Sequence, residues 1–321
     1  MTNSISRPDE FSLIATLFAP LAGEGAFGLK DDAAVIAPSA GHELVVTTDT
    51  IIEGVDFFAN DPADTVAKKV LRVNLSDLAA KGARPRAYLL TLALPQKTGM
   101  DWLTEFARGL KEDQVAFGLS LLGGDTSATP GPLSISVTAF GEAPIGKMIR
   151  RDGARVGDFI YVTGTIGDSG GGLAILKGEG GDSSELVARY RVPQPCSTFG
   201  IALGGIVSAA LDVSDGLIAD LGHIAEASNV RMMVDTERVP LSEALKSLWG
   251  GDAVLRAVTC GDDYEIAFTA SPERDADIFA LARKLDMTVT RIGRVEGGKG
   301  VVLLDGRGQE IQVSRPGYRH F

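Results

Sequence analysis

Aspartates stand at the ends of apolar runs at six places in the chain. Side chains in such positions can converge in a cleft instead of pointing to bulk water. Each aspartate alone has an ordinary explanation: Asp215 as a helix N-cap, Asp125 as a turn residue and Asp77 on a solvated helix face. Six such placements together favour a group of oxygen ligands, the type that Mg²⁺ prefers. The six motifs contain Asp31-Asp32, Thr47-Thr48-Asp49, Asp77, Gly124-Asp125, Asp212-Val213-Ser214-Asp215 and Asp262-Asp263.

A cluster of carboxylates repels itself, because close neighbours cannot all stay ionised cheaply. Divalent cations together with a polyphosphate resolve that conflict, which indicates phosphoryl transfer between phosphate-bearing molecules. A phosphate oxygen that accepts the group is already anionic at neutral pH, so no general base is required. The chain has 3 histidines, His42, His223 and His320. We therefore expect metal-assisted transfer with no residue acting as catalytic acid or base.

Two glycine-rich segments have spacings that occur in phosphate-binding loops. Gly141 to Lys147 fits G-x-x-x-x-G-K, but Met148 stands where a metal-binding hydroxyl is required, and the residues after it favour turns. We interpret this match as accidental. Gly164 to Gly172 lies between a predicted strand and an apolar helical segment. It could bind phosphate through backbone N–H groups or form a tight strand-to-helix turn, and the sequence favours neither.

Composition excludes several classes of protein. The 321 residues carry 31 Lys plus Arg against 42 Asp plus Glu, a net charge of −11, with 26 Asp and 16 Glu. No basic cluster offers the phosphate footprint that nucleic-acid binding requires. Cys196 and Cys260 form neither a zinc motif nor a disulfide framework, and packing roles are expected for both. No apolar stretch could span a bilayer, and the N-terminus lacks a signal-peptide pattern, so we expect a cytoplasmic location and no membrane partner.

Strand-like and helix-like segments alternate, which predicts an α/β fold (α+β) of two mixed domains, residues 1–148 and 149–321. A polar, glycine-punctuated connection beginning at Arg150 separates them. The predicted helices cover residues 10–21, 62–80, 101–117, 198–209, 216–228 and 273–285. The predicted strands cover residues 44–46, 133–140, 159–162, 210–213, 231–235, 264–269, 289–295 and 300–304, with a short apolar run at 119–122.

Motifs along nearly the whole chain, in order, resemble those of thiamine-monophosphate kinases. These enzymes belong to a superfamily with aminoimidazole-ribonucleotide synthetase and selenophosphate synthetase, which share a general ATP site. The combination present here resembles the thiamine branch specifically. The matching segments are Lys30–Val35, Thr47–Phe57, Val73–Ala83, Gly123–Asp125, Arg151–Asp158, Tyr161–Ser169, Leu211–Leu217 and Gly317–Phe321.

The resemblance implies ATP-dependent phosphorylation of thiamine monophosphate to thiamine diphosphate. It also implies a homodimer whose N-terminal sheets pair into a barrel, with several Mg²⁺ ions as cofactors and ATP as co-substrate. Carried over by position, the implied metal ligands are Asp31 (close by), Asp32, Thr47, Thr48, Asp49, Asp77, Asp125, Asp212 and Asp215. The implied ATP contacts are Gly124, Asp125, Arg151 and Ser214, and the implied substrate contacts are Asp56, Asp262 and Tyr318.

Three positions depart from the family pattern: Lys30 replaces a usual Gly, Asp56 a usual His and Asp262 a usual Glu. Asp56 matters most, because a carboxylate cannot donate to a substrate phosphate as a histidine can. Two other functions stay open. The chain could be another ATP-dependent small-molecule kinase or synthetase of the superfamily, or a non-catalytic nucleotide-binding module.

Overall fold

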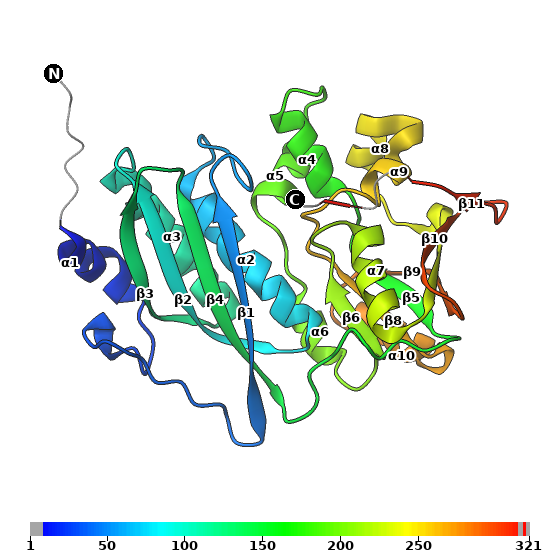
Figure 1. Cartoon of the computed structure of the whole chain (residues 1–321), viewed down its shortest axis with the longest axis horizontal. Coiled ribbons are helices and arrows are strands. Elements are labelled where there is room, and N and C mark those ends of the chain that lie inside the picture. The colour runs from blue at the N-terminus through cyan, green and yellow to red at the C-terminus, as the bar shows by residue number, and fades with distance from the viewer. Residues whose placement is uncertain (1–8, 314–316, 319–321) are drawn as a thin grey trace. The chain divides into compact units, whose positions relative to one another are not determined.

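The computed structural model describes residues 9–313 together with 317 and 318. The chain divides into two compact units (Figure 1). Of the described residues, the N-terminal unit contains 9–78 and 84–146, and the C-terminal unit contains 79–83, 147–313, 317 and 318. Both are mixed α/β structures, as predicted. Within the described residues, no helix is long and apolar enough to cross a membrane.

The N-terminal unit is built on a four-stranded sheet in the order β1-β4-β2-β3. Its strands are β1 (His42–Ile52), β2 (Arg84–Pro95), β3 (Ser120–Thr129) and β4 (Ser134–Pro144). β2 and β3 are parallel, and the other two pairs are antiparallel. Helices α2 (Ala63–Ala80) and α3 (Met100–Phe117) cover one face of this sheet (Figure 1). The opposite face is called the open face below.

Helices α2 and α3 pack closely where a glycine removes the side chain. A Cβ on Gly109 of α3 would lie 2.5 Å from the carbonyl oxygen of Asp64 in α2. Arg72 of α2 adds a two-pronged ion pair to the buried Asp113 of α3, with N–O distances of 2.7 and 2.8 Å. Such charge-assisted, planar contacts fix orientation as well as adding stability. These contacts therefore hold α2 in a defined position against α3.

The N-terminal segment lies along the β3 side of the sheet (Figure 1). Helix α1 (Glu10–Leu13) continues as a π-helical turn, Ile14–Phe18, and a 3₁₀ turn, Ala19–Leu21. Ala22 then forms an isolated parallel bridge to Leu121 of β3. The predicted helix over residues 10–21 is thus confirmed as helical backbone of mixed type.

The C-terminal unit contains a seven-stranded sheet in the order β11-β10-β7-β9-β5-β8-β6. Two separate clusters of buried side chains pack against it, one including Leu186, Leu217 and Leu245 and the other including Phe199 and Ile278. The strands are β5 (Phe159–Thr163), β6 (Ala209–Asp212), β7 (Arg231–Asp235), β8 (Ile266–Ala270), β9 (Val289–Glu296), β10 (Gly300–Leu304) and β11 (Glu310–Ile311). The helices are α4 (Asp168–Leu176), α5 (Ser184–Arg191), α6 (Ser197–Ala202), α7 (Leu217–Ser228), α8 (Glu243–Trp249), α9 (Ala253–Ala257) and α10 (Asp275–Lys284).

The structure corrects three of the element predictions. Strand β2 was not predicted, although Tyr88 to Leu94 is a near-continuous apolar run of the kind that central strands have. The run at 119–122 continues as β3 to Thr129, so Asp125 is a strand residue and not a turn residue. The helix predicted for 198–209 ends at Ala202, because a Gly204-Gly205 pair follows and Gly205 has a left-handed φ of 77°.

A buried carboxylate ties the start of β1 to its neighbours. Glu142 of β4 is 8% exposed and accepts from Arg86 at 2.6 Å and from the Ser39 backbone at 3.1 Å. Burial alone raises the pKa of Glu142, but these bonds outweigh it and hold the pKa at about 2, below the ordinary 4.5. A lowered folded-state pKa contributes stability above pH 4.5, and that contribution is lost as the pH falls toward 2.

Glu142→Gln is therefore expected to lower the free energy of unfolding by about 1–2 kcal/mol at neutral pH, after discounting for the partial exposure of Arg86. The difference from wild type should shrink between pH 4.5 and 2. Urea titrations at several pH values measure this difference in the free energy of unfolding. Glu243→Gln is the matched control, because its ion pair with Lys246 is solvent-exposed. Equal effects of the two substitutions would contradict the assignment.

Candidate metal centre

Thr47, Asp49 and Asp77 form a cluster on the helix-covered face of the N-terminal sheet. Thr47 and Asp49 are two residues apart in β1, so their side chains point to the same face. The Thr47 hydroxyl donates to the carboxylate of Asp77 in α2. Burial raises the pKa of Asp49 to about 7, and the charges of Asp77 and Asp56 add to this. A bound cation would relieve this crowding of negative charge.

Asp56 adjoins this cluster in the loop that follows β1. One of its carboxylate oxygens accepts from the Ile52 backbone at 2.8 Å, and its carbonyl oxygen accepts from Lys69 Nζ at 2.8 Å. Lys69 belongs to α2 and is 2% exposed. Lys69 is a functional residue that was not predicted, although its place among the apolar residues Val66, Val70 and Val73 was a usable signal. Its ammonium group fixes the backbone at the position of the predicted substrate contact.

Lys69→Met is expected to lower the free energy of unfolding of metal-free protein by about 1–3 kcal/mol, because a buried carbonyl loses its donor and nearby carboxylates lose a cation. Lys68→Met is the matched control, since the neighbouring Lys68 makes surface ion pairs with Asp64 and Glu112. Denaturant unfolding in the presence of a chelator measures both. If the two variants lose equal stability, Lys69 has no special role in holding the Asp56 loop.

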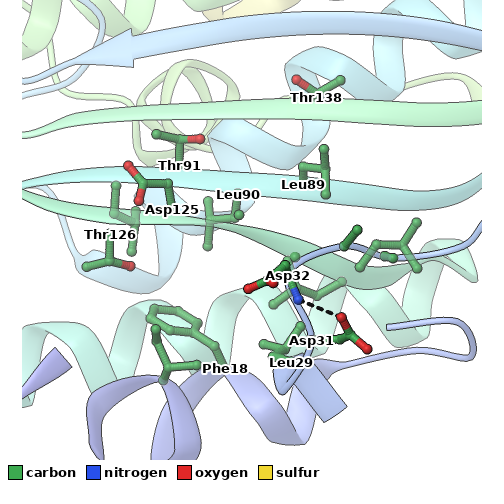
Figure 2. A pocket seen from close by; sticks show the side chains of 18 of the residues that line it. Phe18, Leu29, Asp31, Asp32, Leu89, Leu90, Thr91, Asp125, Thr126 and Thr138 are labelled. Carbon is green, nitrogen blue, oxygen red and sulfur yellow. Dashed lines mark hydrogen bonds between the residues drawn. The ribbon is translucent and has the colours of Figure 1, made fainter. Parts of the chain in front are cut away.

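A second group of predicted residues lines a cavity of about 600 Å³ on the open face (Figure 2). Asp31 and Asp32 come from the segment before β1, and Asp125 comes from β3. The Asp32 backbone donates to the Asp31 carboxylate at 2.8 Å (Figure 2). Gly124 is required because a Cβ there would lie 1.7 Å from the carbonyl oxygen of Leu90. Hydroxyl groups missed by the sequence analysis also line this cavity, at Thr91, Thr126 and Thr138.

Thr48 belongs to the open face and not to the Asp49 cluster. Its hydroxyl contacts the Thr138 hydroxyl and the Val137 carbonyl oxygen, each at 3.1 Å. Successive side chains of a strand point to opposite faces, so Thr48 cannot share the face to which Thr47 and Asp49 point. The predicted ligands Thr47, Thr48 and Asp49 are adjacent in sequence but lie on two faces of the sheet.

The two groups are also separated across the sheet. Asp49 lies in β1 and Asp125 in β3, which are the two edge strands of the order β1-β4-β2-β3. Three inter-strand spacings correspond to about 14 Å, whereas a Mg²⁺ ion lies about 2 Å from each ligand oxygen. Within one chain, Asp49 and Asp125 therefore do not approach a common ion.

In the C-terminal unit, backbone hydrogen bonds bring four predicted residues together. The Asp262 backbone donates to the Ser214 carbonyl oxygen at 2.8 Å, and the Tyr318 backbone donates to that of Asp215 at 2.9 Å. Asp212 ends β6 close by in sequence and is 8% exposed. The Arg151 carbonyl oxygen accepts from the hydroxyl of Ser228 at the end of α7, and the neighbouring Arg150 carbonyl oxygen accepts from the Ala210 backbone in β6 at 3.1 Å.

Asp220 organises the loop before α7. One carboxylate oxygen accepts the backbone N–H groups of Ser214, Asp215 and Gly216, each at 3.0 Å. Burial and the charge of Asp215 raise the pKa of Asp220 to about 7. Ligand atoms of Asp215, Asp220 and His223 lie within 4.8 Å of one another, a group able to hold a cation. Asp220 was not predicted as a site residue, although the i, i+3 spacing of Asp220 and His223 on a predicted helix places both on one face.

The contacts of the two glycine-rich segments favour structural roles over phosphate binding. Residues 145–158 form turns and irregular backbone, so no helix follows the Gly141–Lys147 match. In the second segment, Asp263 accepts from the backbone of Gly167 at 2.7 Å and Ser169 at 3.3 Å, where a phosphate would otherwise bind. A Cβ on Gly172 would lie 2.1 Å from the Leu186 carbonyl oxygen. This favours the tight-turn interpretation, with the glycines needed for packing against α5.

Comparison with known proteins identifies the family. Residues 30–143 match the family model described as AIR synthase related protein, N-terminal domain, and residues 155–306 match the corresponding C-terminal domain. A thiamine-monophosphate kinase of Caulobacter vibrioides is 42% identical, over 98% of this chain and 91% of the relative. One of Escherichia coli strain K12 is 37% identical, over 97% and 98%. The chain belongs to the thiamine-monophosphate kinase family.

Solved structures agree with this membership. The crystal structure of the Stenotrophomonas maltophilia thiamine-monophosphate kinase has a TM-score of 0.81 at 42% identity, covering 88% of this chain and 91% of that one. The structure described as AaThiL complexed with AMPPCP and TMP has a TM-score of 0.79 at 30% identity, covering 97% and 94%. The hydrogenase maturation protein HypE, at 21% identity, shares the fold.

Proposed function

We propose that this chain transfers a phosphoryl group from ATP to thiamine monophosphate and forms thiamine diphosphate. The observation that carries the proposal is the cluster of Thr47, Asp49 and Asp77, where burial and neighbouring carboxylates raise the pKa of Asp49 and the oxygen ligands fit a divalent cation. Family membership and a relative solved with an ATP analogue and TMP support the choice of substrates. The acceptor oxygen is anionic, so a shortage of histidine does not impede the reaction.

Asp49 and Asp77 have the oxygen donors and the negative charge to hold Mg²⁺, and Thr47 adds a hydroxyl oxygen. When bound, Mg²⁺ offsets phosphate charge and aligns the two anionic substrates. Lys69 holds the Asp56 loop beside these residues. On the resemblance, Ser214 and Arg151 contact ATP, and Asp262 and Tyr318 contact thiamine monophosphate. We propose direct in-line transfer, which isolation of a phosphorylated enzyme during turnover would contradict.

We further propose that a homodimer completes the metal group. Among the described residues, β1 and most of β3 have an outer edge that no other strand of the chain covers. Pairing β1 of one copy with β3 of the other would close two sheets into a barrel. It would also bring Asp125 and the adjoining Asp31-Asp32 segment of one copy next to β1 of its partner, where Thr48 shares the open face and Asp49 is the following residue on the opposite face. The separation of these residues within one chain supports this arrangement.

The deciding experiment is a substrate panel followed by ADP release with Mg²⁺ and ATP. Strong dependence on thiamine monophosphate, with thiamine diphosphate as product, is the expected result. ADP release that depends on a different small molecule would favour another ATP-dependent enzyme of the superfamily. Binding of ATP and Mg²⁺ without ADP release for any acceptor would favour a nucleotide-binding module.

A further inference from the structure

A small cavity of about 160 Å³ lies in the N-terminal unit, apart from the cavity of Figure 2. It is formed by the loop after β1, the turn after β2 and the start of α3. No residue of the predicted metal or nucleotide sites lines it. Its walls combine aromatic side chains (Phe57, Phe58 and Trp102) with oxygen-bearing ones (Glu53, Asp61 and Thr98) and include Lys97, which pairs with Glu53.

The walls of this cavity are held in place by contacts of their own. The Asp61 carboxylate accepts from the Phe58 backbone at 2.8 Å, which fixes the loop that carries Phe57 and Phe58. Trp102 stacks on Phe106 of α3, with ring centroids 5.1 Å apart and an interplanar angle of 16°. Glu53 is paired with Lys97 at 2.5 Å. The cavity is therefore preformed, which lowers the ordering cost of binding.

The lining selects for a flat, amino-substituted ring. Aromatic walls bind a planar ring by stacked or edge contacts. Carboxylate and hydroxyl oxygens accept hydrogen bonds from an amino group on such a ring. The volume suits a single six-membered ring, because a cavity of about 150 Å³ in another protein accommodates benzene. A larger group such as a whole nucleotide does not fit.

The location connects this cavity to the proposed reaction. Phe57 directly follows Asp56, the predicted substrate contact, and the Asp56 charge acts on Asp49. A ring held here would therefore lie beside the loop that carries Asp56. We propose that this cavity binds the aminopyrimidine ring of a substrate. The proposal rests on the proposed function: thiamine monophosphate carries such a ring, and the adenine of ATP contains one. The proximity of Asp56 favours thiamine monophosphate.

Steady-state kinetics of Phe58→Leu and Thr98→Val test this proposal. Each variant is expected to raise the KM of one substrate by about 3- to 10-fold, the equivalent of one aromatic contact or hydrogen bond, with little change in kcat. A rise for thiamine monophosphate assigns the cavity to the thiamine ring, and a rise for ATP assigns it to adenine. Unchanged KM values for both substrates in both variants would overturn the proposal. Phe11→Leu is the matched control, because Phe11 is 80% exposed on α1.

A second measurement separates ring binding from a general distortion of the site. The phosphorylated thiazole half of thiamine monophosphate lacks the aminopyrimidine ring. If the cavity holds that ring, Phe58→Leu should weaken inhibition by thiamine monophosphate analogues that carry it and leave inhibition by the thiazole phosphate unchanged. Equal weakening for both ligands would overturn the thiamine assignment. If the wild-type enzyme phosphorylates thiamine monophosphate and both variants have wild-type kinetics, ring binding in this cavity is refuted and the proposed function still stands.

Discussion

Asp49→Asn and Asp77→Asn are each expected to lower the turnover of the proposed kinase reaction by at least about 100-fold. That factor corresponds to about 3 kcal/mol of transition-state stabilisation, a reasonable cost for one lost metal-mediated contact. Asparagine keeps the size and one oxygen of the side chain but removes the negative charge. The Thr47 hydroxyl can still donate to an amide oxygen at position 77, so the local packing is preserved. The measurement is kcat and its dependence on Mg²⁺ concentration.

Stability distinguishes this loss of activity from misfolding. The charge of Asp77 helps to raise the pKa of Asp49, so removing it relieves repulsion in the metal-free protein. Asp77→Asn should therefore unfold at the same temperature as wild type in a chelator, or at a higher one, while its stabilisation by added Mg²⁺ falls. Asp101→Asn, at an exposed position of α3, is the matched control. Near-normal turnover in both cluster variants would refute the metal assignment.

The sequence predicted that Asp49 and Asp77 are site residues, but it did not predict which of the candidate ligands lie together on one face of the sheet. Asp49 and Asp77 stood out because each ends or interrupts an apolar run, and that local signal survives folding. That local signal does not tell to which face of the sheet each side chain points. Thr48 lies away from its two neighbours because strand alternation applies once β1 extends from His42 to Ile52, and only residues 44–46 had been predicted as strand.

Residues that act through tertiary contacts were the ones missed. In the sequence Lys69 resembles an ordinary surface lysine, and only its bond to the loop after β1 shows its role. Asp220 likewise resembles an ordinary helix residue, and its role depends on the three backbone N–H groups that it accepts. The short helices α5, α8 and α9 span 8, 7 and 5 residues, too few for a helical repeat to show. Strand β2 was missed for a related reason: its apolar run was compatible with a buried strand or a helix, and its flanking prolines, Pro85 and Pro95, obscured its ends.

The separation of Asp49 from Asp125 leads to the second prediction, which concerns mixed dimers. If β1 of one copy meets β3 of the other, each site takes Asp49 from one protomer and Asp125 from its partner. A dimer that combines an Asp49→Asn chain with an Asp125→Asn chain then has one site with both defects and one intact site. Random exchange makes half of the dimers mixed, so the mixture of two inactive variants should regain about one quarter of wild-type activity.

Co-expression of the two variants with different affinity tags, followed by purification through both tags, isolates the mixed dimers. Their activity should then approach about one half of wild type, because one of two sites is intact. Mixing Asp49→Asn with Asp77→Asn is the matched control: Asp49 and Asp77 belong to the same face of the same protomer, so neither site of that mixed dimer is intact and no activity should return. Recovery in both mixtures, recovery in neither, or a protein that stays monomeric would contradict the shared site. Recovery confined to the first mixture would mean that the distance of about 14 Å across one sheet is bridged by the second copy.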